Sequence, residues 1–189
     1  DVLEERGFRE TTIVIFTSDH GEMAGDHQRL NKRVFYEESA RIPLIVSIPG
    51  ATTAGSGCNA LVDNLDIFPT LLEIGDCPPS NRCRALSLLP LLSDPRLTLK
   101  GEVFSEVARE TNSGRFTRTT MVRTDRYKYA VDDLGRGFML FDMAEDPQEN
   151  NNLVGNPNCR DVEADMQGRL LNFMLNTQYE QHFPGARRK

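Results

Sequence analysis

Hydrophobic residues follow two different patterns, one before and one after about residue 100. In the first part, apolar or β-branched residues follow one another without alternation in two short runs, TTIVIFT (11–17) and IPLIVSIPG (42–50). Such runs are typical of strands buried on both faces, as in a parallel sheet covered by helices. The sequence therefore predicts parallel-type strands here. The segment between them is too polar for a core, although VFYEES (34–39) could hold a turn of helix.

Two helical segments are predicted in the same part of the chain. DIFPTLLEIG (66–75) has one apolar and one polar side, with Asp66 as a plausible N-cap, Pro69 in the first turn and Gly75 as the stop. The opening residues, DVLEERG (1–7), are typical of the last turns of a helix. Because they include neither an initiator Met nor a signal-like apolar region, we expect residue 1 to lie inside a longer protein.

After residue 100 the chain carries short strand-like pieces, EVFSEV, RTTMVRT, YKYAV and FMLFDM, which predict an antiparallel meander. Residues 160–175 place apolar side chains at intervals of four, which predicts a helix with one buried stripe. We therefore predict an α/β fold. Residues 1–99 form part of a mixed, mainly parallel sheet flanked by helices, and 100–189 form a small α+β subdomain, an antiparallel sheet with one C-terminal helix.

Charge and composition exclude some classes of function. The formal net charge of −6 argues against a nucleic-acid-binding protein, which would more often be basic. No apolar run approaches the roughly 18 to 20 residues of a membrane span. Four cysteines stand at positions 58, 77, 83 and 159, and none forms the C-x-x-C pair expected of a zinc cluster. Cys77 and Cys83 are close enough in sequence for a disulfide, but spacing alone does not establish one.

An acidic residue and an imidazole, Asp19 and His20, directly follow the first apolar run. In open α/β sheets, ligands bind beyond the carboxyl ends of the strands. A carboxylate and an imidazole suit a divalent cation such as calcium, magnesium or manganese, although two ligands are too few for a complete site. The alternative is a strand-to-helix turn in which Asp19 caps a helix and His20 forms an ordinary hydrogen bond.

A second acid–imidazole pair, Asp26 and His27, follows in the same loop, and Lys32 comes after it. An ammonium group would stabilise an anion held at a metal, and an imidazole could protonate a leaving group. The alternative is that Lys32 is solvated and that His27 forms hydrogen bonds within its loop.

These residues stand in a longer segment, 12–50, that closely resembles the C-terminal half of the sulfatase family, within the alkaline phosphatase superfamily. The run S-D-H-G-(x)3-G-D-H-(x)4-K carries the resemblance, and further similar segments follow in order: LVDNLDIFPTLLEIGDCPP, ALSLLPLL, MVRTDRYKYAV and FMLFDMAEDPQENNNLV. The resemblance implies that 1–99 is the C-terminal portion of a sulfatase-like catalytic domain. It also implies an extracytoplasmic location, periplasmic or secreted.

The resemblance also implies roles for individual residues. Asp19 and His20 are similar to the family's metal ligands, with calcium as the first expectation and magnesium or manganese as alternatives. Lys32 is similar to a catalytic, substrate-binding lysine that contacts the sulfate and the ester oxygen. His27 falls where related enzymes place a residue near the substrate, and we expect it to bind substrate and act in catalysis. A formylglycine hydrate, made from Cys or Ser, would attack sulfur while the cation holds it.

The family's nucleophile lies in a C-x-P-S-R-type motif of the N-terminal half. CPPSNR (77–82) is not that motif, because one extra residue separates Ser from Arg and the stretch follows the 66–75 helix. We therefore expect a C-terminal part of a sulfuric ester hydrolase, inactive by itself, whose partners are a sulfate ester and the missing N-terminal half.

Two alternatives remain open. The first is a phosphonate monoester or phosphodiester hydrolase, because many sulfatases have Asn where His20 stands and the histidine form also occurs in these enzymes. The second is a non-catalytic module. The only candidate substrate loop is 108–118, whose arginines could meet an anionic sugar or solvent.

Overall fold

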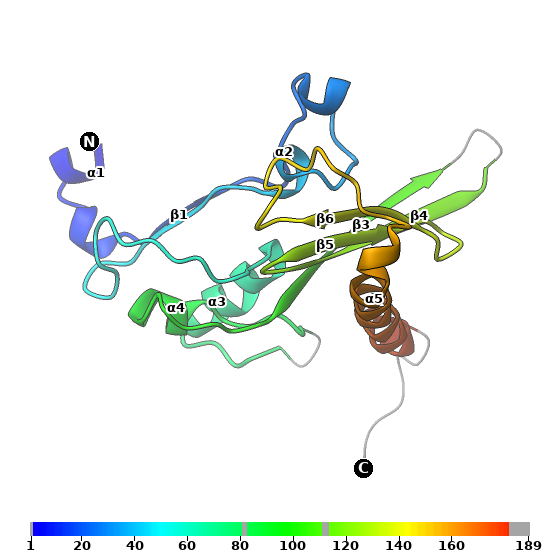
Figure 1. Ribbon diagram of the computed structural model, residues 1–189. Coiled ribbons are helices and arrows are strands. Elements are labelled where there is room, and N and C mark those ends of the chain that lie inside the picture. The colour runs from blue at the N-terminus through cyan, green and yellow to red at the C-terminus, as the bar shows by residue number, and fades with distance from the viewer. Residues whose placement is uncertain (1, 81–82, 111–113, 182–189) are drawn as a thin grey trace, which may run out of the picture. The chain divides into compact units, whose positions relative to one another are not determined.

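The computed structural model describes residues 2–80, 83–110 and 114–181, with the backbone alone for 178–181. The chain divides into two compact units, Asp1–Lys32 with Tyr36–Val103 and Arg33–Phe35 with Phe104–Lys189 (Figure 1). This division falls close to the predicted boundary between 99 and 100. The inclusion of Arg33–Phe35 in the second unit has no counterpart in the sequence pattern.

The first unit contains two strands and several short helical elements. Its strands are β1 (Val14–Thr17) and β2 (Leu44–Ser47). Its α-helices and 3-10 helices are α1 (Val2–Glu5), η1 (Arg9–Thr11), η2 (Asp26–Gln28), α2 (Glu37–Ala40), η3 (Asn64–Asp66), α3 (Ile67–Ile74) and α4 (Leu89–Ser93). The predicted turn of helix in VFYEES and the predicted helix over 66–75 are therefore both present.

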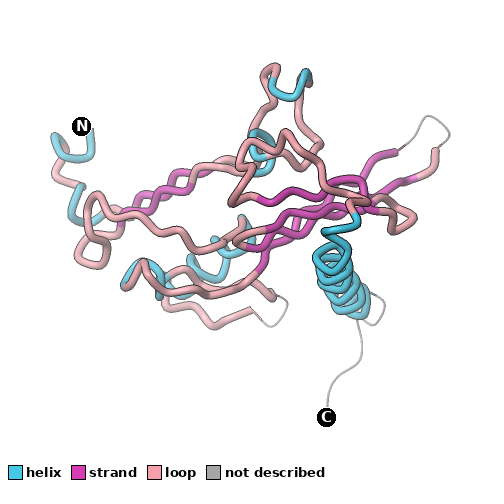
Figure 2. The backbone as a smooth tube through the Cα atoms, viewed as in Figure 1, coloured by secondary structure: helices cyan, strands magenta, loops and turns pink. Residues whose placement is uncertain are grey.

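The two strands β1 and β2 pair antiparallel, so the prediction of parallel-type strands is wrong for this pair (Figure 2). A parallel pair needs a long crossover connection, usually a helix, whereas the connection here contains only η2 and the single turn α2 among the described elements. Full burial on both faces is also not observed, because Phe16 is 58% exposed and Ile45, directly opposite it, is 60% exposed. A continuous apolar run therefore indicated a strand but not its direction.

Asp66 stands at the N-cap position of α3 as predicted, but its side chain makes no capping hydrogen bond to α3. Asp63 instead caps η3, and its carboxylate accepts a hydrogen bond from the backbone of Leu65 at 3.0 Å. The buried Asp66 side chain turns back and accepts from the Asp63 backbone N–H at 2.9 Å, which completes a capping box. The helical segment therefore begins one 3-10 turn earlier than the sequence suggested.

The second unit confirms the predicted meander and C-terminal helix. Its four-stranded sheet has the order β3 (Glu102–Glu110), β4 (Phe116–Thr124), β5 (Tyr127–Val131) and β6 (Gly137–Asp142). After the 3-10 turn η4 (Pro157–Cys159), helix α5 (Arg160–Gln181) packs on the sheet. Their shared core comprises Val122, Tyr129, Val131, Leu140, Met166 and Leu170.

A buried ion pair joins two of the sequence motifs within the second unit. The Nζ atom of Lys128, in RTDRYKY, lies 2.7 Å from Oε1 of Glu149, in DPQENNN, and both side chains are almost completely buried. Lys128 also donates a hydrogen bond to the Phe35 carbonyl at 2.9 Å. Lys128 therefore links Phe35 to Glu149 within this unit.

Some predictions fall wholly or partly outside the described residues. The end of CPPSNR (81–82), the centre of the candidate substrate loop (111–113) and the basic tail lie there. Cys77 and Cys83 are free thiols in the structure. Within the described part of the chain, no helix is long and apolar enough to cross a membrane.

Candidate metal and substrate site

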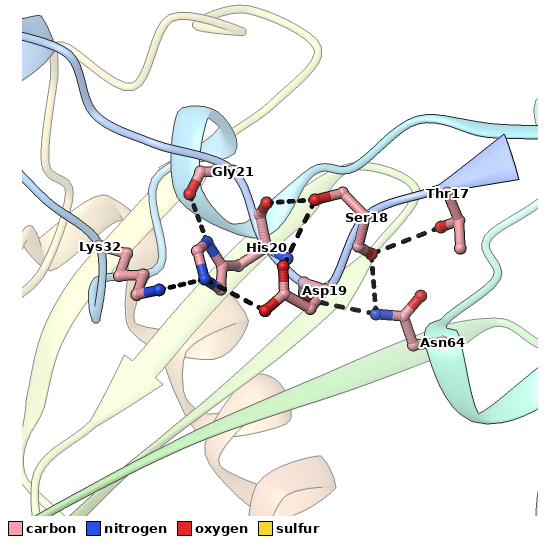
Figure 3. A network of polar contacts seen from close by, with 7 residues as sticks. All are labelled: Thr17, Ser18, Asp19, His20, Gly21, Lys32 and Asn64. Atoms are coloured by element: carbon pink, nitrogen blue, oxygen red, sulfur yellow. Dashed lines mark hydrogen bonds and ion pairs between the residues drawn. The ribbon is translucent and has the colours of Figure 1, made fainter.

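Strand β1 ends at Thr17 and leads into a tight turn that carries Asp19 and His20 (Figure 3). Gly21 makes this turn possible, because a Cβ atom there would lie 1.9 Å from the carbonyl oxygen of Glu38. The Gly21 N–H donates a hydrogen bond to the Ser39 carbonyl at 2.9 Å. The turn therefore packs directly against the backbone of α2, and only glycine fits.

The His20 ring is held in one tautomer by the backbone carbonyl of the next residue, Gly21. Nδ1 lies 2.7 Å from the carbonyl oxygen of Gly21, and a carbonyl oxygen can only accept, so Nδ1 carries the proton. In the neutral ring this leaves a lone pair on Nε2, which is the atom that faces Asp19 and Lys32. His20 is therefore arranged as a nitrogen donor for a cation.

Asp19 places an exposed carboxylate beside that nitrogen. Its side chain is 84% exposed, and its Oδ2 atom lies 3.3 Å from Nε2 of His20. The other oxygen, Oδ1, accepts a hydrogen bond from the His20 backbone N–H at 3.0 Å. Asp19 does not cap a helix, because the next described helical element, η2, has Gly25 as its N-cap.

The electrostatic surroundings keep Asp19 ionised. Desolvation would raise its pKa, but the charge of His20, the backbone N–H groups and Lys32 together lower the pKa below the usual 3.8. Asp19 is therefore an anionic oxygen ligand at neutral pH.

Lys32 reaches the same turn from the loop that follows. Its Nζ atom is hydrogen-bonded to Nε2 of His20, although the residue is exposed overall. Figure 3 shows Lys32, His20 and Asp19 in one continuous chain of polar contacts. The structure thus brings together three of the four predicted site residues.

The fourth, His27, makes a different set of contacts. Its ring stacks on Tyr36 with centroids 3.9 Å apart and an angle of 12° between the planes. Its Nε2 atom lies 3.9 Å from Oε2 of Glu38, beyond hydrogen-bonding distance, and only 15% of its side chain is exposed. Its backbone is left-handed, with φ of 51°. His27 therefore packs on α2 and its neighbour rather than contacting His20.

One residue of the site was missed in the sequence. The side-chain amide of Asn64, the first residue of η3, donates to the carbonyl oxygens of Ser18 at 3.2 Å and Asp19 at 3.4 Å. The only sequence signal nearby is the D-x-x-D capping box around it. That pattern predicts a turn but not its contact with residues more than 40 positions away.

The donors present fit a divalent cation only in part. A carboxylate oxygen and an imidazole nitrogen 3.3 Å apart can both bind one ion, and both atom types are ordinary ligands of calcium, magnesium and manganese. No group of three or more His, Cys, Asp or Glu side chains suited to a metal occurs among the residues that the structure describes. Any cation held here needs further ligands.

Comparison with known protein families gives one match over most of the chain. The model described as "N-sulphoglucosamine sulphohydrolase, C-terminal" matches residues 25–176. The matched range includes Lys32 and Asn64 and begins just after Asp19 and His20, so the match carries no information on those two residues.

Individual proteins agree with the family match. Arylsulfatase K of Gallus gallus is 34% identical over 158 residues, which cover 80% of this chain and 29% of that protein. A structure solved in complex with its substrate D-glucosamine-2-N,6-O-disulfate has a TM-score of 0.80 and 27% identity, covering 98% of this chain and 38% of that one. The phosphonate monoester hydrolase of Agrobacterium radiobacter also has a TM-score of 0.80 and 27% identity, covering 92% and 37%. These likenesses confirm the α/β fold class, and the chain spans about a third of the length of the relatives it matches.

Proposed function

The chain belongs to the sulfatase family, within the alkaline phosphatase superfamily, and from this premise we propose that it is the C-terminal part of a metal-dependent sulfuric ester hydrolase. One observation supports this assignment most directly. A carboxylate, an imidazole nitrogen and an ammonium group meet at the turn after β1, although Lys32 lies twelve residues from His20 in sequence. Such a cluster suits an anion bound beside a cation.

In this proposal, Asp19 and His20 supply two metal ligands. A bound divalent cation, calcium in the first place and magnesium or manganese as alternatives, would polarise a sulfate oxygen as a Lewis acid. Asp19 contributes the anionic oxygen. His20 contributes Nε2, and the Nδ1–H···O contact with Gly21 keeps the ring in the right tautomer and orientation.

Lys32 is the proposed catalytic and substrate-binding residue. Its ammonium already lies at Nε2 of His20, the atom assigned to the metal. With Nε2 of His20 assigned to the metal, the ammonium of Lys32 would bind a sulfate oxygen and the ester oxygen. There it would stabilise the negative charge that develops on the departing alkoxide.

His27 is proposed as a substrate-contacting residue and general acid, on the resemblance alone. In the present arrangement its ring is held between Tyr36 and Glu38. A proton transfer from His27 therefore requires its Nε2 atom to face the leaving group rather than Glu38.

The remaining parts of the site would come from outside this chain. The proposed nucleophile, a formylglycine hydrate made from Cys or Ser, and the acidic residues that complete the metal site belong to the N-terminal half. The chain alone is therefore expected to hydrolyse no ester. An extracytoplasmic location, periplasmic or secreted, is part of the proposal and rests on the resemblance.

The proposal is tested with the full-length enzyme and an aryl sulfate. Replacing Lys32 by Ala removes one charge-stabilising donor, so kcat/KM should fall by roughly 10²- to 10³-fold. Asp19→Ala should abolish calcium binding as well as turnover. Arg96→Ala removes an exposed cation of the same unit, paired only locally with Asp94, and should leave both unchanged. Wild-type turnover in Lys32→Ala would contradict the assignment.

A second candidate function is hydrolysis of phosphonate monoesters or phosphodiesters. The observation that favours it is the structural likeness to a phosphonate monoester hydrolase, together with His rather than Asn at position 20. Assaying the same enzyme with an aryl sulfate, an aryl phosphonate and an aryl phosphodiester separates these reactions by their kcat/KM values. Turnover of none of them would favour the non-catalytic alternative.

A further inference from the structure

One amide side chain, that of Asn64, is hydrogen-bonded to the backbone of the proposed metal-ligand turn (Figure 3). Asn64 donates to the carbonyl oxygen of Ser18 and, more weakly, to that of Asp19. One acceptor belongs to Asp19, the first residue of the ligand pair, and the other to Ser18, which directly precedes it. The Asp19 carboxylate is mostly exposed, and within the described part of the chain it accepts hydrogen bonds from the Ser18 hydroxyl and the His20 N–H and lies beside the His20 ring. Its direction is therefore set by the backbone that Asn64 contacts.

The turn that carries Asn64 is itself fixed by hydrogen bonds. Asn64 opens η3, whose capping box of Asp63 and Asp66 satisfies the backbone N–H groups at the start of the turn. Asp66 is completely buried, and its Oδ1 atom also accepts a hydrogen bond from the Leu86 backbone at 3.0 Å. A buried carboxylate with its hydrogen-bond partners in place has few alternative positions.

Lys100 forms ion pairs with both carboxylates of the capping box. Its Nζ atom lies 2.6 Å from Oδ2 of Asp66 and 2.8 Å from Oδ2 of Asp63, and 17% of its side chain is exposed. One ammonium group thus bridges both carboxylates of the capping box. Because breaking a buried ion pair is costly, Asp63, Asp66 and Lys100 form a stable base for the turn that carries Asn64.

We propose that Asn64, supported by the Asp63–Asp66–Lys100 cluster, is a positioning residue that fixes the backbone of Asp19 so that its carboxylate and Nε2 of His20 point at one cation. This inference rests on the proposed function, in which Asp19 and His20 bind the metal. Partners of this outer kind commonly change metal affinity by roughly 10- to 100-fold. Because Asn64 is exposed and contacts the backbone rather than a ligand side chain, we expect the lower end, about tenfold.

The test uses the full-length enzyme and Asn64→Leu, which keeps roughly the side-chain size but removes the N–H donor without adding a charge. Calcium binding is measured by titration calorimetry, and the Mn²⁺ complex is examined by electron paramagnetic resonance. We expect calcium affinity about tenfold weaker, an altered Mn²⁺ spectrum, and turnover that recovers at saturating metal. Asn64→Gln, which keeps a donor, should bind calcium more tightly than Asn64→Leu.

The controls separate this inference from the proposed function and from a purely structural role. Asn151→Leu makes the same change at an exposed asparagine of the second unit and should bind calcium as the wild type does. Asn64→Ala serves as the second variant if Asn64→Leu does not fold. Wild-type affinity and spectrum in a folded Asn64 variant overturn the inference, even if its Tm is lower. Wild-type calcium affinity in Asp19→Ala overturns the proposed function instead.

Discussion

At the residue scale, Gly21 decides whether the ligand turn can form. A Cβ atom at this position would meet backbone atoms of Glu38, which cannot rotate away as a side chain could. Gly21→Ala should therefore displace the turn, destabilise the fold by about 1–3 kcal/mol and weaken calcium binding. Thermal unfolding and calcium titration of the full-length enzyme check this. Gly57→Ala is the matched control, because no atom lies within 4 Å of its added Cβ. Equal Tm and affinity in the two variants would contradict the prediction.

The buried phenol of Tyr129 gives a pH dependence of stability. Burial, and then the charge and hydrogen bond of Glu163, raise the pKa of Tyr129 from 10.0 to about 12. The folded state therefore favours the protonated phenol. Its contribution to stability is complete below about pH 10 and is lost as the pH rises toward 12. Urea unfolding at several pH values between 8 and 12 should show a steeper loss of stability for the wild type than for Tyr129→Phe. Parallel curves would contradict the assignment.

Contacts of the candidate site that depend on local geometry could be predicted from the sequence, whereas contacts that depend on tertiary packing could not. Asp19 and His20 are adjacent at a strand end, so their convergence follows from local geometry. Lys32 was expected to contact a bound anion near the metal, but its contact with His20 was not predicted, since a polar loop has no periodicity that fixes its path. The contacts of His27 with Tyr36 and Glu38, and the role of Asn64, depend on tertiary packing that no local pattern encodes.

At the element scale, the joint between β5 and the turn after β6 depends on the Lys128–Glu149 ion pair. Lys128→Met would leave the Glu149 carboxylate buried without its cation, which should cost about 3–5 kcal/mol. The double variant Lys128→Met/Glu149→Leu removes both charges and should recover much of this loss. Denaturant unfolding of the four proteins of the cycle measures the coupling. Additive losses would show that the pair does not act as a unit.

The same elements show what a pattern can and cannot predict. The meander and α5 were predicted because alternation, turn residues and a four-residue spacing each report local geometry. The antiparallel direction of β1 and β2 was not predicted, because burial on a sheet leaves the same apolar pattern in either direction. Asp66 was correctly predicted as the N-cap of α3, but the preceding turn η3 with its own cap, Asp63, was missed, since Asp63 and Asp66 are equally good caps by residue type.

At the scale of the whole molecule, the sheet of the first unit leaves apolar side chains uncovered. Phe16 and Ile45 lie opposite each other across β1 and β2, and both are more than half exposed. Opposite residues of an antiparallel pair are in contact, so they form one apolar patch rather than two scattered residues. Among the residues that the structure describes, this sheet has two strands, so each has an edge without a partner strand, and such edges attract further strands. In the proposed full-length enzyme, the N-terminal half would cover this patch.

The 189-residue chain produced by itself is therefore expected to associate through the sheet face that carries Phe16 and Ile45. Light scattering coupled to size exclusion should give a mass that rises with protein concentration, because burial of exposed apolar surface drives self-association. The double variant Phe16→Thr/Ile45→Thr removes the apolar patch but introduces a residue that is itself common in strands. It should lower the mass toward that of a monomer. Leu134→Thr changes an exposed apolar residue in a turn of the second unit, and should leave the association unchanged. A constant monomer mass for the wild type would contradict the prediction, whereas equal association in all three proteins would place the contact on another surface.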